Sequence, residues 1–298
     1  MPSPADKTFD LRPGGRTAAR PAPARLGRYE ILGELGKGAM GVVFRARDPM
    51  INREVALKTI PLAAEFEGDE LEQARSKFFR EAETAGRLSH PHIVTIFDAG
   101  ESEGTAYIAM ELLRGNPLVD YTDPAGLLPP AIAIEVVARL AGALQYAHEQ
   151  SVVHRDIKPA NIMFHASSGE LKITDFGIAR ITDSGRTRTG IVLGTPSFMS
   201  PEQLQGRPVT GRSDLFSLGV TLYQLLTGQL PFRADSMPAL MLKIAHEPHP
   251  PIRTLRPGLP AGVDDFFDRA LAKDPADRFA LGAEFAQALR DINTPKRG

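Results

Sequence analysis

The sequence predicts an α+β fold with two lobes: a small N-terminal lobe built on an antiparallel sheet with one helix, and a larger, mainly helical C-terminal lobe. Three observations predict it. Strand-like patterns of β-branched and alternating residues fill positions 29–60 and return at 93–112. A polar segment with apolar side chains at helical spacing lies between them, and long apolar-periodic segments dominate after Gly115.

The N-terminal lobe is expected over residues 28–112, after a flexible tail at 1–27 that is rich in Pro, Ala, Arg and Gly. Glycines and an Asp-Pro pair separate the strand candidates, which are 29–35, 42–47, 54–60, 93–98 and 105–112. The segment 70–88 is the helix candidate, because its apolar side chains recur every three or four positions.

The C-terminal lobe is expected over residues 113–292, followed by a short tail at 293–298. Pro129 and Pro130 open a long helical segment that ends near Gln150, as proline commonly begins a helix. Short strands are expected at 152–153, 162–164 and 171–173, and further helices at 212–227, 238–246, 263–272 and 280–292. A ligand site is expected where the lobes join, since binding sites favour such junctions.

Composition limits the function. The chain has 298 residues with 35 basic and 36 acidic side chains, so its formal net charge of -1 creates no field that attracts nucleic acid or an anionic membrane. It has no cysteine, which removes thiolate metal sites and a cysteine nucleophile and suits a reducing compartment. No segment approaches the roughly 20 apolar residues of a membrane span. We therefore expect a cytoplasmic protein that has no membrane span in this chain and binds no nucleic acid.

The densest group of reactive side chains lies in the segment HRDIKPAN, which begins at His154, and in the DFG segment that follows it. A hard divalent cation takes oxygen ligands, which Asn161 and Asp175 can supply. A hydroxyl nucleophile needs a carboxylate within hydrogen-bond reach, and Asp156 is the candidate. Lys158 offers a positive charge to a phosphoryl group in transfer. The mixture indicates phosphoryl transfer from a magnesium-bound nucleotide.

Gly36, Gly38 and Gly41 match the pattern G-x-G-x-x-G, which is a weak signal alone because a glycine turn between strands would also explain it. Strand-like segments on both sides favour a hairpin over phosphates rather than the strand-to-helix turn of dinucleotide-binding folds. The pattern is not a Walker loop either, because no Gly-Lys-Ser/Thr closes it.

Lys58 ends an apolar strand, and Glu81 lies in the predicted helix. Taken separately, the lysine would extend into solvent and the glutamate would lie on a solvated helix face. Taken together, they predict an ion pair that would hold Lys58 toward the α and β phosphates of a nucleotide.

These motifs resemble those of the eukaryotic-like (Hanks-type) Ser/Thr protein kinases, most closely the bacterial branch. The resemblance covers roughly residues 29–289. Its motifs occur in the family's order, which is the glycine loop, VALK, the helix glutamate, HRDIKPAN, DFG, GTPSFMSPE, SDLFSLG and DPADRF. It implies a bilobal protein kinase fold and transfer of the ATP γ-phosphate to Ser and Thr hydroxyls of proteins, with Mg²⁺ or alternatively Mn²⁺. A pseudokinase scaffold and a small-molecule kinase are the alternatives.

The resemblance assigns roles to individual residues. Asp156 would orient the substrate hydroxyl and accept its proton, and Lys158 would neutralise the γ-phosphate. Lys58, paired with Glu81, would contact the α and β phosphates. Asn161 and Asp175 would hold the metal. The remaining ATP-binding residues would be Leu35, Gly36, Lys37, Gly38, Gly41, Val43, Ala56, Met110, Glu111, Leu113 and Met163, with Met110 as gatekeeper and Glu111 and Leu113 in the hinge.

Other residues receive structural roles from the same resemblance. Glu202 and Arg278 would form an ion pair, and Asp214 would anchor the backbone of the catalytic loop. His154 would pack against Phe176, and it is therefore not proposed as a base.

Regulation is expected in the segment between DFG and SPE. Autophosphorylation is expected at Thr187 or Thr189, where Arg155 would pair with the new phosphate and order the loop. Thr195 would lie at the substrate edge, and together with Lys158 it implies specificity for Ser and Thr. The expected partners are protein substrates and, for autophosphorylation in trans, a second copy of the chain.

Overall fold

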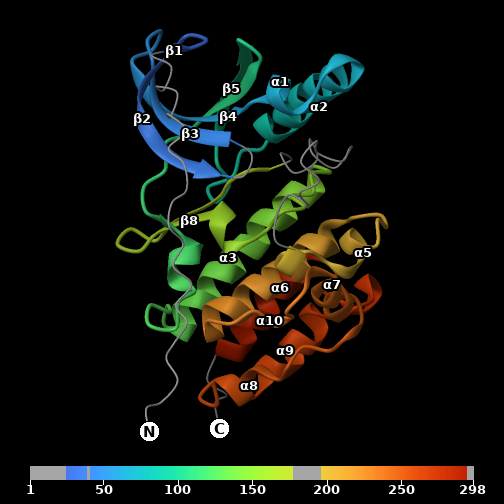
Figure 1. Cartoon of the computed structure of the whole chain (residues 1–298). Coiled ribbons are helices and arrows are strands. Elements are labelled where there is room, and N and C mark those ends of the chain that lie inside the picture. Colours follow the sequence, from blue (N-terminus) through green and yellow to red (C-terminus); the bar gives the residue numbers. More distant parts are fainter. Residues whose placement is uncertain (1–24, 39–40, 177–195, 294–298) are drawn as a thin grey trace, which may run out of the picture.

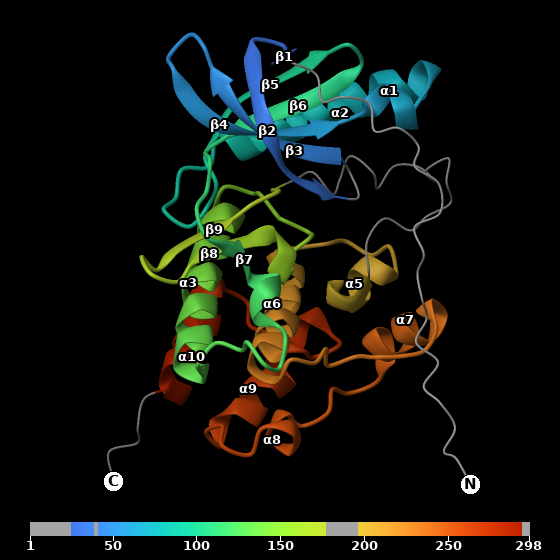
Figure 2. The same cartoon turned by 60° about the vertical axis from the view of Figure 1, so that its left-hand side comes forward.

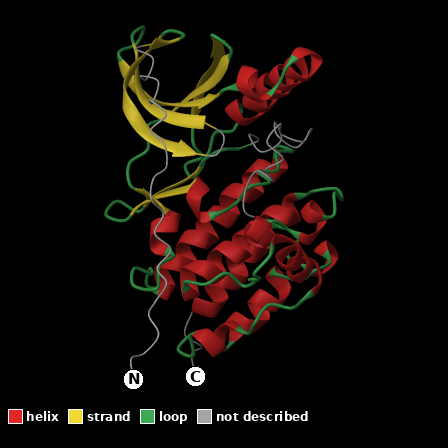
Figure 3. Cartoon of the chain, in the orientation of Figure 1, coloured by secondary structure: helices red, strands yellow, loops and turns green. Residues whose placement is uncertain are grey.

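The computed structural model describes residues 25–38, 41–176 and 196–293 of the chain. Figure 1 shows two lobes, with strands β1 to β6 and helices α1 and α2 above and the remaining labelled helices below. Colouring by secondary structure separates the same two parts, because most of the strands gather in the upper lobe (Figure 3). The predicted α+β architecture with two lobes is confirmed.

The upper lobe is built on a six-stranded antiparallel sheet with the order β1-β2-β3-β4-β6-β5. Its strands are β1 Arg25–Leu26, β2 Tyr29–Gly38, β3 Gly41–Asp48, β4 Arg53–Ile60, β5 Ile96–Ser102 and β6 Thr105–Met110. Strand β1 lies in the segment that the sequence assigned to the tail. Leu26 and Tyr29 face each other across the β1–β2 ladder and are both buried, so apolar burial extends the sheet to Arg25.

The two faces of this sheet have separate cores. Helix α2 (Gly68–Gly86), with the short α1 (Leu62–Glu65) beside it, packs Phe78 against Ile60 and Ile108 on one face. Leu57 belongs to the cluster on the opposite face. Because successive side chains of a strand point to opposite faces, Lys58 lies on the same face as Ile60, toward α2.

The lower lobe is mainly helical and surrounds helix α6, which is buried along most of its length. Its helices are α3 Pro130–Glu149, α5 Pro201–Leu204, α6 Gly211–Thr227, α7 Met237–His246, α8 Ile252–Leu255, α9 Gly262–Ala270 and α10 Gly282–Asn293. Short 3-10 helices cover Leu118–Tyr121, Pro159–Asn161, Pro196–Phe198 and Pro275–Asp277. Within the described residues, no helix has the length and apolar character needed to cross a membrane.

A small antiparallel sheet lies between the large sheet and the lower helices (Figure 2). It contains β7 Asn116–Pro117, β8 Ile162–His165 and β9 Glu170–Ile173 in that order. The strand predicted at residues 152–153 is wrong. Val152 is buried in the core of the lower lobe, but the described strands that pair with β8 are β7 and β9.

The segment 92–95 connects the lobes by bonding to the lower sheet. The amide of Ile173 donates to the His92 carbonyl at 2.9 Å, and the amide of Val94 donates to the Ile173 carbonyl at 2.9 Å. Strand β5 therefore begins at Ile96, three residues later than predicted, because the preceding backbone pairs with β9 instead of β6.

Candidate active site

Two predicted site residues, Lys158 and Asn161, come together around a third, Asp156. The Lys158 Nζ atom donates to both carboxylate oxygens of Asp156, at 3.0 and 2.7 Å. The Asn161 Nδ2 atom donates to the Asp156 carbonyl at 2.8 Å and to Oδ2 at 2.9 Å. These bonds hold the carboxylate in one orientation, which is what a group that must meet a substrate hydroxyl requires.

The turn before Asp156 has an unusual backbone. Arg155 has φ of 70°, a left-handed conformation that costs a residue other than glycine on the order of 1–3 kcal/mol. Asp214 compensates, because its buried carboxylate accepts the amides of His154 at 2.9 Å and Arg155 at 2.8 Å. Its Oδ2 also lies 2.8 Å from Nε2 of His148. The predicted anchoring role of Asp214 is confirmed.

Both ring nitrogens of His154 are engaged in local hydrogen bonds. Nδ1 accepts the Asp156 amide at 3.2 Å, so Nε2 carries the proton and donates to the Thr174 carbonyl at 2.7 Å. The ring is buried and meets Phe176 edge to face, with centroids 4.5 Å apart. The prediction that His154 packs against Phe176 is confirmed.

The structure gives Lys58 a partner that the sequence did not predict. Its Nζ atom lies 2.8 Å from Oδ2 of Asp175. Glu81 is buried on α2, so the alternative that it lies on a solvated helix face is wrong. Its pairing with Lys58 stays a prediction. Strand alternation places Lys58 on the face of the sheet toward α2, but it cannot predict a contact with Asp175, which lies far along the chain. Asp175 itself has a left-handed backbone conformation, with φ of 66°.

Asn161 and Asp175 suit a magnesium ion. The Asn161 side chain uses Nδ2 for its bonds to Asp156, which leaves Oδ1 as an oxygen ligand. The Asn161 carbonyl accepts both the amide and the hydroxyl of Thr174, at 2.9 and 3.1 Å, so the two candidate ligands are fixed relative to one another. In the described part of the chain, no group of three or more His, Asp or Glu side chains could hold a metal. Two protein oxygens completed by phosphate oxygens and water are typical of magnesium.

Four of the predicted adenine contacts form one apolar cluster. Ala56 and Met110 are buried together, and Val43 and Leu113 pack against them. The β3–β4–β6 register explains this, because Ala56 faces Met110 across one ladder while its neighbour on the same face, Lys58, faces Val43 across the other.

The other predicted contacts lie around this cluster or in the hinge. Met163 is partly buried on β8, and Leu35 is 51% exposed on β2. In the hinge, the Glu111 amide is already engaged with the Thr95 carbonyl at 2.9 Å. The Glu111 carbonyl and the Leu113 backbone are therefore the hinge groups proposed for a base edge.

The glycine pattern forms a hairpin, as the flanking strands predicted. Gly38 pairs with Gly41 at the end of β2 and β3, and residues 39–40 lie outside the described part. Gly41 has φ of 147°, and a Cβ atom there would lie 1.8 Å from the Thr59 carbonyl oxygen. No atom would lie within 4 Å of a Cβ atom at Gly36. Gly41 is thus required by the sheet itself, whereas Gly36 has open space beside it.

The comparison with known families agrees with this geometry. The model of the protein kinase domain matches residues 29–291. The chain belongs to the protein kinase family.

Curated relatives of this kinase-family chain come from several bacteria. They include the serine/threonine-protein kinase PknJ of Mycobacterium tuberculosis, 42% identical over 266 residues, which are 87% of this chain and 44% of the relative. PknD of the same species is 40% identical over 273 residues, 91% of this chain and 40% of the relative. PrkC of Bacillus subtilis is 39% identical over 265 residues, 89% and 40% of the two chains. The chain therefore spans about two fifths of the length of these relatives.

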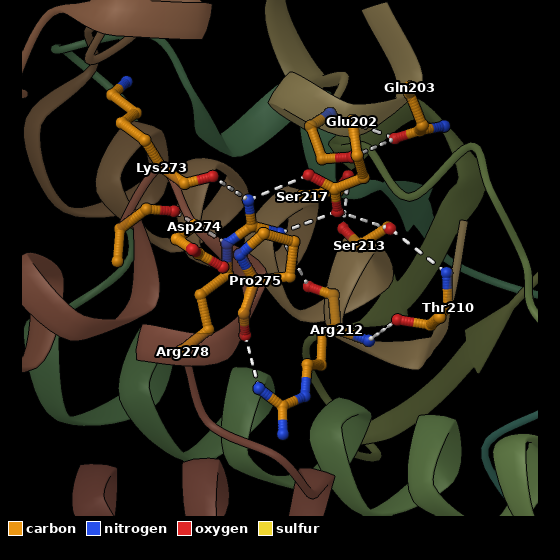
Figure 4. A network of polar contacts seen from close by, with 12 residues as sticks. Glu202, Gln203, Thr210, Arg212, Ser213, Ser217, Lys273, Asp274, Pro275 and Arg278 are labelled. Carbon is orange, nitrogen blue, oxygen red and sulfur yellow. Dashed lines mark hydrogen bonds and ion pairs between the residues drawn. The ribbon is translucent and has the colours of Figure 1, made fainter. Parts of the chain in front are cut away.

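A buried ion pair joins Glu202 of α5 to Arg278 in this kinase-family chain (Figure 4). Arg278 donates from both terminal nitrogens to the two Glu202 oxygens, at 2.8 and 2.9 Å, and Ser213 Oγ donates to Oε1 at 2.6 Å. Burial alone would raise the pKa of Glu202, but the hydrogen bonds from Arg278 and Ser213 outweigh it and lower that pKa. The predicted pair of Glu202 and Arg278 is confirmed.

Sequence reasoning missed three residues that support the site. His148 contacts Asp214, Lys172 binds the Glu111 carboxylate at 2.7 Å, and Gln203 binds the Arg155 carbonyl at 2.8 Å. Only Gln203 had a local signal, because a serine followed three positions later by glutamine is the pattern of a helix capping box.

Thr187, Thr189 and Thr195 lie outside the described residues. Their assignment as phosphorylation sites and as the substrate edge therefore remains a prediction from the sequence.

Proposed function

We propose that this chain is a protein serine/threonine kinase that transfers the ATP γ-phosphate to Ser and Thr hydroxyls of proteins, including its own activation loop. The arrangement of Asp156, Lys158 and Asn161 carries the proposal, because it joins a fixed carboxylate to a cation and an oxygen ligand within one loop. The relatives named as serine/threonine-protein kinases support the same substrate class.

The nucleotide would lie between the glycine hairpin and the lower sheet. Val43, Ala56 and Met163 are proposed to enclose the base, and Lys58 to contact the α and β phosphates. Its present contact with Asp175 supports this role, since it holds the ammonium group within 2.8 Å of a proposed metal ligand. Asn161 and Asp175 would hold Mg²⁺, which when bound neutralises phosphate charge.

The chain's own groups would then act on the protein substrate. Asp156 would align the Ser or Thr hydroxyl and accept its proton. Lys158, which already donates to that carboxylate, would stabilise the negative charge of the transferred group. The apolar cluster of Ala56 and Met110 would exclude water from the base.

Arg155 supports regulation by loop phosphorylation. Its Nε atom is buried and has no hydrogen-bond partner among the described residues. A phosphate on Thr187 or Thr189 would offer this guanidinium strong acceptors and a charge of opposite sign. Phosphorylation in trans would require a second copy of the chain as a partner.

Labelled ATP with Mg²⁺ and a mixed protein substrate tests the proposal, using the wild type and Asp156→Asn. The variant is expected to lose about 10²- to 10⁴-fold in transfer rate, because the proton acceptor is removed while its shape is kept. Asp265→Asn, at an exposed position on α9, is the matched control and should behave as wild type.

Three results would contradict the proposal. They are label found only on small molecules, no transfer by the wild type, or equal transfer by Asp156→Asn. Mass spectrometry of the wild-type product tests the regulatory part, which fails if the chain is fully active with Thr187 and Thr189 unmodified.

A further inference from the structure

The side chain of Gln203 connects helix α5 to the catalytic loop. Its Nε2 atom donates to the Arg155 carbonyl at 2.8 Å. Its Oε1 atom accepts the amide and the hydroxyl of Ser200, both at 3.0 Å. Ser200 is fully buried and begins α5, so this one amide group joins the cap of the helix to the loop that carries Asp156.

The carbonyl that Gln203 binds belongs to the peptide between Arg155 and Asp156. The three amides of this left-handed turn have partners as well. Asp214 accepts the amides of His154 and Arg155, and His154 accepts the amide of Asp156. Gln203 binds the carbonyl side of the peptide that enters Asp156, and it does so from a different element, α5.

Helix α5 is itself firmly held. Glu202, the neighbour of Gln203, takes part in the buried pair with Arg278, and Figure 4 shows Gln203 beside it. The Arg207 amide also bonds back to the Glu202 carbonyl at 2.9 Å. A side chain that projects from such a fixed helix can define the position of the group it binds.

We propose that Gln203 is a positioning residue for Asp156, acting through the hydrogen bond that it donates to the Arg155 carbonyl. The bonds that it accepts from Ser200 fix the direction of this donor. The inference rests on the proposed function, in which the direction of the Asp156 carboxylate decides the rate of transfer. A small displacement of that carboxylate lowers the rate without changing how the nucleotide binds.

Two variants of Gln203 separate its donor from its acceptor. Gln203→Glu keeps the oxygen that Ser200 requires but removes the donor to Arg155. Gln203→Lys keeps a donor but removes the acceptor. If the donor positions Asp156, Gln203→Glu is expected to lower kcat by roughly tenfold with KM for ATP within about twofold of wild type. Gln203→Lys should then retain most of the wild-type kcat, with a lower melting temperature. If Gln203 served only as a helix cap, Gln203→Glu would keep the wild-type kcat and Gln203→Lys would have the lower one.

Hydrogen exchange of the peptide that contains Arg155 and Asp156 gives a readout that needs no turnover. It should be faster in Gln203→Glu than in wild type, and unchanged in Gln205→Glu, an exposed glutamine of the same helix end. Wild-type kcat and wild-type exchange in Gln203→Glu would overturn the inference. A wild type without transfer activity would refute the proposed function, while the exchange comparison would still decide whether Gln203 fixes the turn.

Discussion

Two Arg–Glu pairs of this chain have similar bidentate geometry but different surroundings. Arg278 and Glu202 are almost fully buried, whereas Arg45 and Glu54, joined at 2.9 and 2.8 Å, are 50% and 37% exposed. A buried pair that loses one partner leaves a charge without solvent or counterion, while an exposed pair exchanges its partner for water. Burial, rather than geometry, decides which pair matters for stability.

Arg278→Met is therefore expected to destabilise the fold by about 3–5 kcal/mol at neutral pH, since it leaves the Glu202 carboxylate buried and unpaired. Arg45→Met should change the unfolding free energy little. Urea denaturation followed by circular dichroism measures both variants. If the two substitutions lowered the unfolding free energy equally, burial would not be what makes the Arg278–Glu202 pair important for stability.

The difference in unfolding free energy between wild type and Arg278→Met should depend on pH, in a direction that the pKa of Glu202 determines. The lowered pKa of Glu202 means that the wild-type pair stabilises the fold above the ordinary carboxyl pKa and that this stability is lost as pH falls through the lowered value. In Arg278→Met, burial alone would raise the pKa of Glu202. Lower pH would then protonate this carboxyl and remove the buried, unpaired charge that destabilises the variant. The difference in unfolding free energy between wild type and Arg278→Met should thus become smaller as pH falls from 7 toward 4.

At the scale of the element, the glycine hairpin contains glycines of two kinds. Gly41 combines a positive φ with a Cβ position blocked by the Thr59 carbonyl, which no rotation of a side chain can relieve. Gly36 has neither constraint. Gly41 is needed for the β3–β4 contact. Gly36 is proposed to be needed only for the approach of phosphates.

Gly41→Ala should consequently lower stability by about 1–3 kcal/mol, as expected for overpacking against backbone. Gly36→Ala, its matched control, should keep the wild-type melting temperature and raise KM for ATP. Thermal denaturation and steady-state kinetics of the two variants check this. A melting temperature for Gly41→Ala equal to that of Gly36→Ala would show that the strand can shift to accept the methyl group.

The sequence predicted elements and sites best where the determining contacts are local. Asp156, Lys158 and Asn161 meet within a single loop, so their spacing was enough to place them together. Lys58 meets Asp175 through tertiary packing, which the spacing of the two residues in the sequence could not predict. The start of β5 was missed for the same reason, because its competing partner, β9, lies far along the chain.

At the scale of the whole molecule, polar contacts supplement the hinge in joining the lobes. Lys58 of the upper sheet meets Asp175, and Lys172 of β9 binds the Glu111 carboxylate in the hinge. The same carboxylate accepts the Thr95 amide at 2.6 Å, and Lys172 also donates to the Ile93 carbonyl at 3.3 Å. Lys172 thereby connects the lower sheet, the hinge and the segment 92–95.

Lys172→Met is expected to loosen this connection while preserving the volume of the side chain. The Glu111 carboxylate, 23% exposed, would lose its cation, and the Ile93 carbonyl would lose a donor, at a cost of about 1–3 kcal/mol. Hydrogen exchange should accelerate at residues 92–95 and 110–113 and remain unchanged in α9 and α10. Lys243→Met, on the distant helix α7, should leave the exchange of both segments as in wild type. Unchanged exchange at 92–95 in Lys172→Met would mean that the backbone bonds between this segment and β9 hold the lobes without the lysine, because those bonds are retained in the variant.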